Sequence, residues 1–468
     1  MKKSEVRSQK QEARSKKLEA RKKPCLLPLA SCIFFSCLLF TAYCLLLTLI
    51  FIPVPAFAQE TTFLSSLIDE ARRNNPEILA YQKRVKAKEH RAKVEGALDD
   101  PQLKVEVMDI PGDKPFNLSD SMQTRYTFNQ MLPFPGKLSL KQKAAMKEVL
   151  MVASEAQNKE LEIVAMLKAT YFDYAFLVES IKITKEIKEI LSQIADIAGA
   201  RYGANLASQQ DVIKSQVELT MLQNELISLE AEKDIVVARI NSILNQDTAT
   251  PLGKPEDIKT YKASIKLDDL IKTAIEKAPA LKAMEYDIQA RDVDIELNKK
   301  NYYPDFMVGV APIQRNGRFD AYDVMFGVNI PLWWGKYDNQ VSEARANAEI
   351  LRAEFKAEQN IKTFEVREAA INVAAADRIR TVYETSLLPQ ADISFQSAMA
   401  SYQTGKIDFL SMLDSERALK KTRIEYIKSV VEYRKNVAFL EKAVGGDLKT
   451  VSSGQFSVVR GEKEETTQ

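Results

Sequence analysis

The chain has 468 residues, and its 66 Lys and Arg nearly balance its 64 Asp and Glu, for a formal net charge of +2. This balance gives no support to a nucleic-acid partner, because proteins that bind nucleic acid carry a clear basic excess. All four cysteines lie between positions 25 and 44, so the rest of the chain has neither a disulfide nor a thiol nucleophile.

Residues 1–58 have the pattern of a signal peptide. Residues 1–24 contain ten Lys and Arg, residues 25–52 are almost wholly apolar, and Ala56-Phe57-Ala58 forms a small-residue cleavage site. Cleavage would start the mature chain at Gln59 and leave it 56 basic and 61 acidic residues, a net charge of −5. The apolar run is long enough to span a bilayer, so an uncleaved inner-membrane anchor stays open. Lipidation at Cys32, within a Leu-Ala-Ser-Cys box, is a further alternative.

The two halves of the mature chain repeat each other. Ten residues between Leu64 and Val107 fall, with a shift of 203 and no gap, on identical residues between Leu267 and Val310. The shift is 199 where Lys137 matches Lys336, and 200 where Tyr202 matches Tyr402. A period near 200 indicates one large unit used twice, because solenoid repeats are far shorter. We expect a first repeat over 59–247, an inter-repeat linker over 248–266, a second repeat over 267–446 and a polar tail over 447–468.

Each repeat predicts the order helix, strand, strand, helix. In the first, we expect a helix over 64–97, strands near 103–107 and 122–131, a long helix over 138–202 and a return helix over 208–245. In the second, strands near 306–310 and 322–330 precede a long helix over 338–402 and a return helix over 409–444. The strands are indicated by alternating apolar and polar residues, and the helices by apolar spacings of three and four. A 65-residue helix is roughly 100 Å long.

The four strands suggest an assembly. Their apolar faces are rich in aromatic residues, and about ten residues suffice for a tilted strand to cross a bilayer. Solvent-facing hairpins are the alternative. Four strands cannot close a membrane barrel, because the smallest such barrels have eight. We therefore expect an α+β membrane protein with a long α-helical coiled-coil barrel, in which four membrane strands per chain contribute to a trimeric twelve-stranded β-barrel.

The combined features resemble the TolC-like outer-membrane efflux protein family, from Leu64 to about Gly446. The matching features are the duplicated unit, the strand-ending segments 132–137 and 330–336, and the helix turns at 202–206 and 402–406. Pro-Phe-Pro-Gly-Lys at 133–137 is also similar to the metal-cation efflux branch. The resemblance implies a homotrimer in the outer membrane of a Gram-negative-type bacterium, extending into the periplasm. It also implies a periplasmic adaptor protein and an inner-membrane efflux pump as partners, with metal cations or drugs as the exported solutes.

The resemblance places the turns between long and return helices at the periplasmic entrance. The candidate adaptor-docking residues there are Asn205, Leu206, Ala207, Gly405, Lys406 and Ile407. The candidate channel gate consists of Asp211, Asp408 and Asp414, since rings of Asp favour cations and can hold a constriction. Asp211 and Asp414 match family aspartate positions, whereas Ser411 departs from the pattern. The structural alternative is that these carboxylates stand in solvent or at helix starts.

No motif predicts catalysis, a cofactor or a metal site. Gly136-Lys137 and Gly335-Lys336 lack the earlier glycine and the following Ser or Thr of a phosphate loop. His90 is the single histidine and has no nearby Cys, and we interpret the scattered methionines as packing. Two alternatives to an efflux channel stay open: an inner-membrane-anchored periplasmic coiled-coil adaptor or scaffold, and an exit duct for type I protein secretion.

Overall fold

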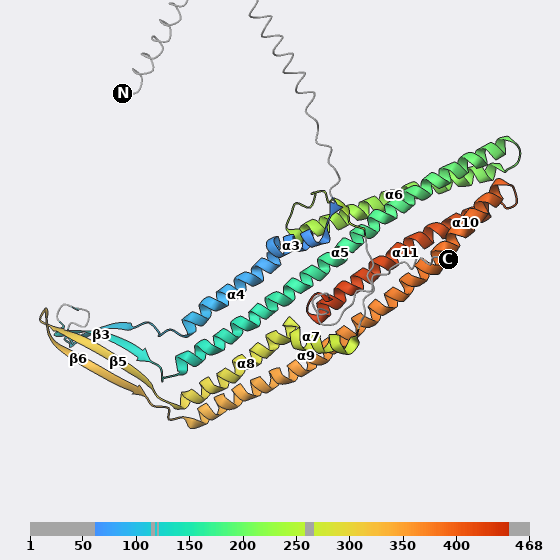
Figure 1. Cartoon of the computed structure of the whole chain (residues 1–468). Coiled ribbons are helices and arrows are strands. Elements are labelled where there is room, and N and C mark those ends of the chain that lie inside the picture. Colours follow the sequence, from blue (N-terminus) through green and yellow to red (C-terminus); the bar gives the residue numbers. More distant parts are fainter. Residues whose placement is uncertain (1–60, 114–117, 119–120, 258–265, 449–468) are drawn as a thin grey trace, which may run out of the picture. The chain divides into compact units, whose positions relative to one another are not determined.

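The computed structural model describes residues 61–113, 118, 121–257 and 266–448 (Figure 1). The expected signal peptide, the middle of the expected linker and nearly all of the expected polar tail therefore lie outside the described residues. In the part of the chain that is described, no helix is both long and apolar enough to cross a lipid bilayer.

The elements of the two halves follow the same order. The first half contains β1 (Thr61–Thr62), α3 (Leu64–Asn74), α4 (Pro76–Glu95), β2 (Gln102–Met108), β3 (Gln123–Leu132), α5 (Lys137–Gly203) and α6 (Gln209–Leu244). The second contains β4 (Lys254–Pro255), α7 (Leu267–Lys277), α8 (Pro279–Lys299), β5 (Asp305–Arg315), β6 (Arg318–Asn329), α9 (Trp334–Val382), α10 (Leu388–Gln403) and α11 (Phe409–Val444). A short 3₁₀ turn, Lys300–Tyr302, precedes β5, and the short strands β1 and β4 pair in parallel.

The first helix of each half is divided in two, where the sequence predicted one. Asn75 adopts an extended backbone between α3 and α4, because the residue before a proline avoids the helical conformation and Pro76 follows. The Asn75 side chain then accepts hydrogen bonds from the backbone N–H groups of Glu77 and Ile78, which caps α4. Ala278 and Pro279 make the same break between α7 and α8, without a side-chain cap.

The long helix of the second half is also interrupted. A π-helical turn, Tyr383–Leu387, separates α9 from α10, and Pro389 follows in the first turn of α10. In the first half, α5 runs without a break for 67 residues. The prediction of one continuous helix over 338–402 was therefore wrong at this point, because a π turn and a proline interrupt the regular α-helical hydrogen bonding there.

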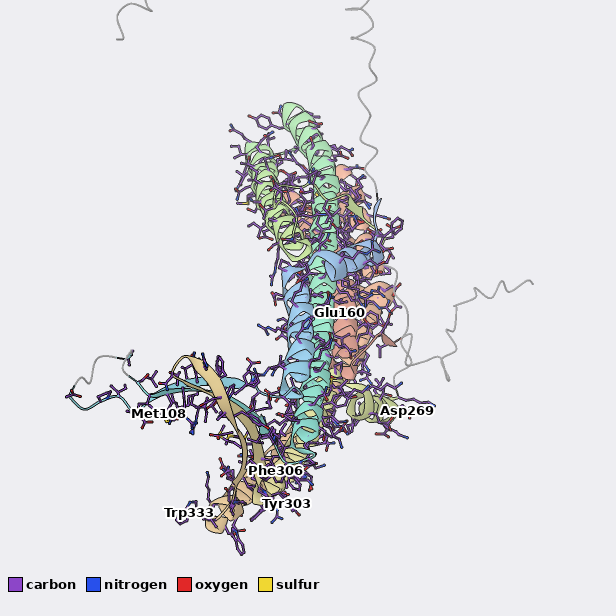
Figure 2. All side chains as sticks on the ribbon, turned by 90° about the vertical axis from the view of Figure 1, so that its left-hand side faces the viewer. Met108, Glu160, Asp269, Tyr303, Phe306 and Trp333 are labelled. Atoms are coloured by element: carbon purple, nitrogen blue, oxygen red, sulfur yellow. The ribbon has the colours of Figure 1, made fainter. Side chains whose placement is uncertain are left out.

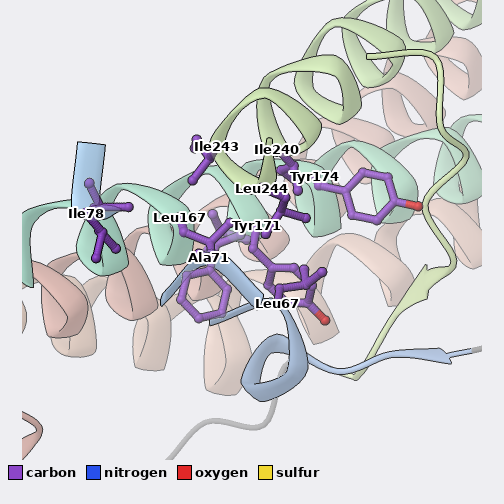
Figure 3. Close-up of a cluster of buried hydrophobic side chains, with 12 residues drawn as sticks. Leu67, Ala71, Ile78, Leu167, Tyr171, Tyr174, Ile240, Ile243 and Leu244 are labelled. Atoms are coloured by element: carbon purple, nitrogen blue, oxygen red, sulfur yellow. The ribbon is translucent and has the colours of Figure 1, made fainter. Parts of the chain in front are cut away.

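Long-range packing forms three main apolar clusters along the helices. One joins α3, α5 and α6 around Leu167 and Tyr171 (Figure 3). A second joins α5, α6, α10 and α11 and includes Ile183, Ile187 and Ile194, whose spacings of four and seven are those of a coiled-coil seam. A third joins α7, α9 and α11. Each fully buried large apolar side chain contributes about 1.5–3 kcal/mol to folding, so these clusters hold the helices side by side.

The sheet joins strands from both halves. Its order is β2-β3-β5-β6, every neighbouring pair is antiparallel, and β3 of the first half pairs with β5 of the second. The sheet lies at one end of α5, whereas the α5–α6 and α10–α11 turns lie at the other (Figure 1).

The strand register separates two faces. Side chains alternate along each strand, and direct cross-strand partners share a side. The apolar face carries Leu103, Val105, Phe128, Val308, Val310, Tyr322, Val324 and Phe326, all of which are exposed. The polar face carries Lys104, Glu106, Arg125, Thr127, Asn129, Met131, Met307, Gly309, Ala311, Asp323, Met325 and Gly327.

Residues 133–137 join the sheet to α5. The Lys137 ammonium lies 2.8 and 3.0 Å from the two carboxylate oxygens of Asp305, and Asp305 also accepts a 2.7 Å hydrogen bond from the backbone N–H of Phe134. The Phe134 ring stacks on Tyr303 with ring centres 4.5 Å apart. Tyr303 and Phe306 mark this passage from α8 to β5 in Figure 2. The Gly-Lys pair thus fastens the start of α5 to the second half of the chain.

Candidate functional site: the paired helix turns

Each long helix ends in the same kind of turn. In the first, Asn205 has a positive φ of 59°, and the Leu206 N–H donates 2.8 Å to the carbonyl of Arg201. In the second, Gly405 has a φ of 74°, and the Lys406 N–H donates 2.8 Å to the carbonyl of Ser401. A left-handed residue followed by a hydrogen bond reaching back five residues is a common way to end a helix. Asn and Gly occupy these positions because they tolerate the left-handed conformation.

Arg201 connects the two turns. Its guanidinium donates to the backbone carbonyls of Tyr402 and Gln403 in the second turn, and to that of Leu206 in its own turn. It also lies over the Tyr402 ring, 5.0 Å from the ring centre. A planar guanidinium suits this combination of several carbonyl acceptors and an aromatic face. The two predicted docking segments are therefore neighbours within one chain.

The predicted docking residues differ in exposure. Asn205, Leu206, Gly405 and Lys406 are exposed, and Leu206 is an unusually open leucine at 68%. Ala207 and Ile407 are half-buried, and Ile407 packs against the cluster that contains Phe409 and Tyr402. The exposed members form a small surface made of both turns.

Two of the predicted gate residues lie at helix starts. Asp408 is the N-cap of α11 and accepts a 3.1 Å hydrogen bond from the Ser411 N–H, and its hydrogen bonds with Ser411 lower its pKa. Asp211 lies in the first turn of α6, where its carboxylate accepts a 3.0 Å hydrogen bond from the hydroxyl of the cap residue Ser208. Both positions stabilise their helices, because carboxylates are favoured at helix N-termini.

The third predicted gate residue, Asp414, stands one turn further along α11. Its side chain is 66% exposed, and it forms a long ion pair with Arg417, at 3.9 Å. The structure gives the surroundings of each aspartate in a single chain, and a ring formed by three chains stays a prediction. Asp211 lies near Tyr402. Burial raises the pKa of the Tyr402 hydroxyl, and the Asp211 carboxylate adds to the rise.

Sequence reasoning missed a buried carboxyl group behind this site. Glu416 on α11 is 1% exposed, and burial raises its pKa to about 7. Glu218 of α6 lies nearby and binds Arg417 through both carboxylate oxygens, and Lys420 lies 2.7 Å from Glu225. The single signal in the sequence is that Glu416 follows the apolar spacing of Met412, Leu413 and Leu419, which put it on the buried face of α11.

Comparison with known proteins identifies one protein family over most of the described chain. The family model "Outer membrane efflux protein" matches residues 67–246 and 270–446. The cobalt-zinc-cadmium resistance protein CzcC of Cupriavidus metallidurans is 22% identical over 385 residues, which cover 80% of this chain and 88% of CzcC. The cation efflux system protein CusC of Escherichia coli is 21% identical, with 82% of this chain and 86% of CusC covered.

Solved structures share the fold. The outer-membrane channel OprN superposes with a TM-score of 0.71 at 16% identity, covering 82% of this chain and 90% of the OprN chain. A CusC structure superposes with a TM-score of 0.69 at 16% identity, covering 82% of this chain and 92% of that one. Because the family model matches two stretches that together make up most of the sequence, the chain belongs to the outer membrane efflux protein family.

Proposed function

We propose that this protein is the outer-membrane channel of a tripartite efflux system, a passive trimeric conduit that exports small toxic solutes across the periplasm and the outer membrane. The observation that carries the proposal is the two-faced sheet. Its apolar face is exposed on all four strands, and the opposite face carries charged, hydroxyl and amide side chains together with methionine, glycine and alanine. Such a surface suits lipid on one side and water on the other.

The strand lengths agree with a membrane span. Strands β3, β5 and β6 have 10, 11 and 12 residues, and a tilted membrane strand needs about 9–11. On β6, Tyr322, Val324 and Phe326 are each at least 70% exposed. Trp333 and Trp334, just beyond β6, are 77% and 70% exposed, as expected for aromatic side chains at a membrane–water boundary.

The edges of the sheet support a trimer. In the described chain, β2 and β6 each have one neighbour, so both present unpaired backbone groups on their outer sides. Unpaired N–H and C=O groups are very costly in lipid, and pairing β6 of one copy with β2 of the next removes them. Three copies give a closed twelve-stranded barrel, wide enough for a water-filled lumen.

The helices then extend into the periplasm. We assign residues 59–247 and 267–446 to the two repeats, 248–266 to the linker between them and 1–58 to a signal peptide. The surface made by Asn205, Leu206, Ala207, Gly405, Lys406 and Ile407 is the proposed docking site for a periplasmic adaptor, which links the channel to an inner-membrane pump. Arg201 positions these segments beside each other.

The position of the helix turns at the periplasmic entrance also suggests a gate, and the relatives suggest the exported solute. We propose that Asp211, Asp408 and Asp414 of three chains form carboxylate rings near the periplasmic entrance, which would favour cations. The names of CzcC and CusC, a metal resistance protein and a cation efflux protein, support metal cations as the exported solutes. Relatives named for toluene and drug export keep organic solutes as the second candidate class.

A matched pair of variants tests the orientation of the sheet. Phe326→Arg and Met325→Arg alter adjacent residues on opposite faces. We expect the first to prevent insertion, because an arginine facing lipid near mid-membrane costs about 2–4 kcal/mol. We expect the second to insert normally. Recovery of each protein from outer-membrane fractions is the measurement, and equal recovery of the two variants would contradict the proposed faces.

A second experiment tests the assembly. The detergent-extracted protein should have the mass of three chains by native mass spectrometry and should conduct ions when reconstituted in planar bilayers. A stable monomer without conductance would overturn the channel proposal.

A further inference from the structure

Three methionines gather on the polar face of the sheet. Met131 of β3 is the direct cross-strand partner of Met307 of β5, and Met325 of β6 lies on the same face, opposite Gly309. The residues beside them on that face are Asn129, Gly309, Gly327 and Asp323. The three thioethers therefore lie beside an amide and a carboxylate, whereas the clusters between the helices are apolar.

Glycine lies opposite two of the methionines, Met307 and Met325. A Cβ atom built on Gly327 would lie 3.0 Å from the methyl carbon of Met307. A Cβ atom built on Gly309 would lie 3.1 Å from the methyl carbon of Met325. Two methionine–glycine pairs thus lie side by side, one in each direction across the same two strands. Glycine in the interior of a strand often marks a place where another group approaches closely.

The side-chain oxygen of Asn129 lies beside Gly309, as does the methyl carbon of Met325. Asn129 of β3 is the cross-strand partner of Gly309, and its side-chain oxygen would lie 2.2 Å from a Cβ atom there. This oxygen is buried and has no hydrogen-bond partner among the described residues. A buried acceptor without a partner is unusual and calls for an explanation, such as an ion.

The ligand types select the class of ion. Within the described ranges, no three His, Cys, Asp or Glu side chains come together as a metal site. Thioether sulfur is a soft ligand that suits Cu⁺, whereas carboxylates and imidazoles suit the harder divalent ions. Ag⁺ shares the charge and softness of Cu⁺. Arg125 is paired with Asp323 at 3.0 Å, so its positive charge is compensated.

We propose that Met131, Met307 and Met325, together with the side-chain oxygen of Asn129, form a transient binding site for a soft monovalent cation, Cu⁺ or Ag⁺. The inference rests on the proposed function, which turns this face of the sheet toward the lumen. A neutral set of ligands holds the ion more weakly than thiolates would, and weak binding suits a conduit, since an ion must leave as readily as it enters.

Silver binding to the purified full-length protein tests the site. Isothermal titration with silver nitrate in a chloride-free buffer compares wild type with the triple variant Met131→Leu/Met307→Leu/Met325→Leu. The matched control is Met122→Leu/Met146→Leu/Met221→Leu, which removes three methionines that are 67%, 50% and 58% exposed elsewhere. We expect the first variant to bind Ag⁺ about tenfold more weakly or worse, and the control to match wild type.

A second readout separates ligation from packing. X-ray absorption at the silver edge should report sulfur neighbours in wild type and in the control, and their loss in the site variant. Asn129→Ala should weaken Ag⁺ binding while leaving the three thioethers in place. Equal binding by both triple variants would overturn the proposal.

Conductance measurements distinguish a failure of the metal-site proposal from a failure of the channel proposal. If the protein conducts in bilayers and both triple variants bind Ag⁺ equally, the metal site is wrong and the channel stands. If the protein neither forms trimers nor conducts, the channel proposal fails, whatever the silver titration shows.

Discussion

The buried carboxyl group of Glu416 gives a quantitative prediction. Burial raises its pKa from 4.5 to about 7, and Glu218 and Glu225 act in the same direction while Lys420 and Arg417 oppose them. One unit of pKa difference between folded and unfolded chain corresponds to about 1.4 kcal/mol. The ionised carboxylate therefore costs the folded hairpin of α10 and α11 about 3 kcal/mol.

The direction of the pH effect follows from the raised pKa. Below about pH 4.5 the carboxyl group is protonated in both the folded and the unfolded chain, so no penalty arises. Between about pH 4.5 and 7 the unfolded chain is ionised while the folded hairpin keeps the proton, so stability falls as the pH rises across this window and levels off above about 7. Glu416→Gln keeps a neutral side chain of the same shape. We expect the variant to resemble wild type at or below about pH 4 and to be more stable by about 3 kcal/mol above about pH 8.

Hydrogen exchange of detergent-solubilised protein measures this difference locally. Peptides from α10 and α11 should exchange about a hundredfold more slowly in the variant at alkaline pH, after correction for the intrinsic exchange rate. Glu425→Gln is the control, because it lies on the same helix with its side chain 37% exposed, and it should change protection little at any pH. Equal protection of wild type and Glu416→Gln above about pH 8, or a gap that does not depend on pH, would refute the reasoning.

Three further outcomes are expected. Lys137→Ala removes the partner of Asp305 and should lower the midpoint of thermal unfolding, through a loss of about 2 kcal/mol, whereas Lys141→Ala, at an exposed position on the same helix, should not. Leu167→Ala opens a cavity in a fully buried position and should cost about 2–5 kcal/mol, measured as faster exchange in the middle of α5. Asp211→Ala combined with Asp414→Ala should raise bilayer conductance, and unchanged conductance would remove both residues from the gate.

The duplicated order of elements was predictable because each half carries its own periodic pattern. The prolines that end β3 and β6, and the apolar spacing of Ile183, Ile187 and Ile194, placed strands and seams near their positions in the structure. Pro76 was visible in the sequence, but its division of the first helix was not predicted. Local signals suffice for such elements because their causes lie within a few residues.

Contacts between the two halves could not be predicted from the sequence. The pairing of β3 with β5, the Lys137–Asp305 ion pair and the bridge from Arg201 to the second turn each join residues more than 160 positions apart. No local pattern encodes such partners. The methionines illustrate the difficulty, since the sequence showed them as isolated apolar residues and the strand register brought three of them to one face.

The π-helical turn at Tyr383–Leu387 also explains a small irregularity in the duplication. Between Lys137 and Tyr202 the first half has one residue fewer than the second half has between Lys336 and Tyr402. A π turn closes its hydrogen bond over five residues instead of four, so it absorbs a single inserted residue without rotating the helix beyond it. The extra residue of the second half is therefore accommodated in the π turn. Removing one residue from this turn should restore a plain α-helix and keep Phe395 and Tyr402 of α10 on its buried face.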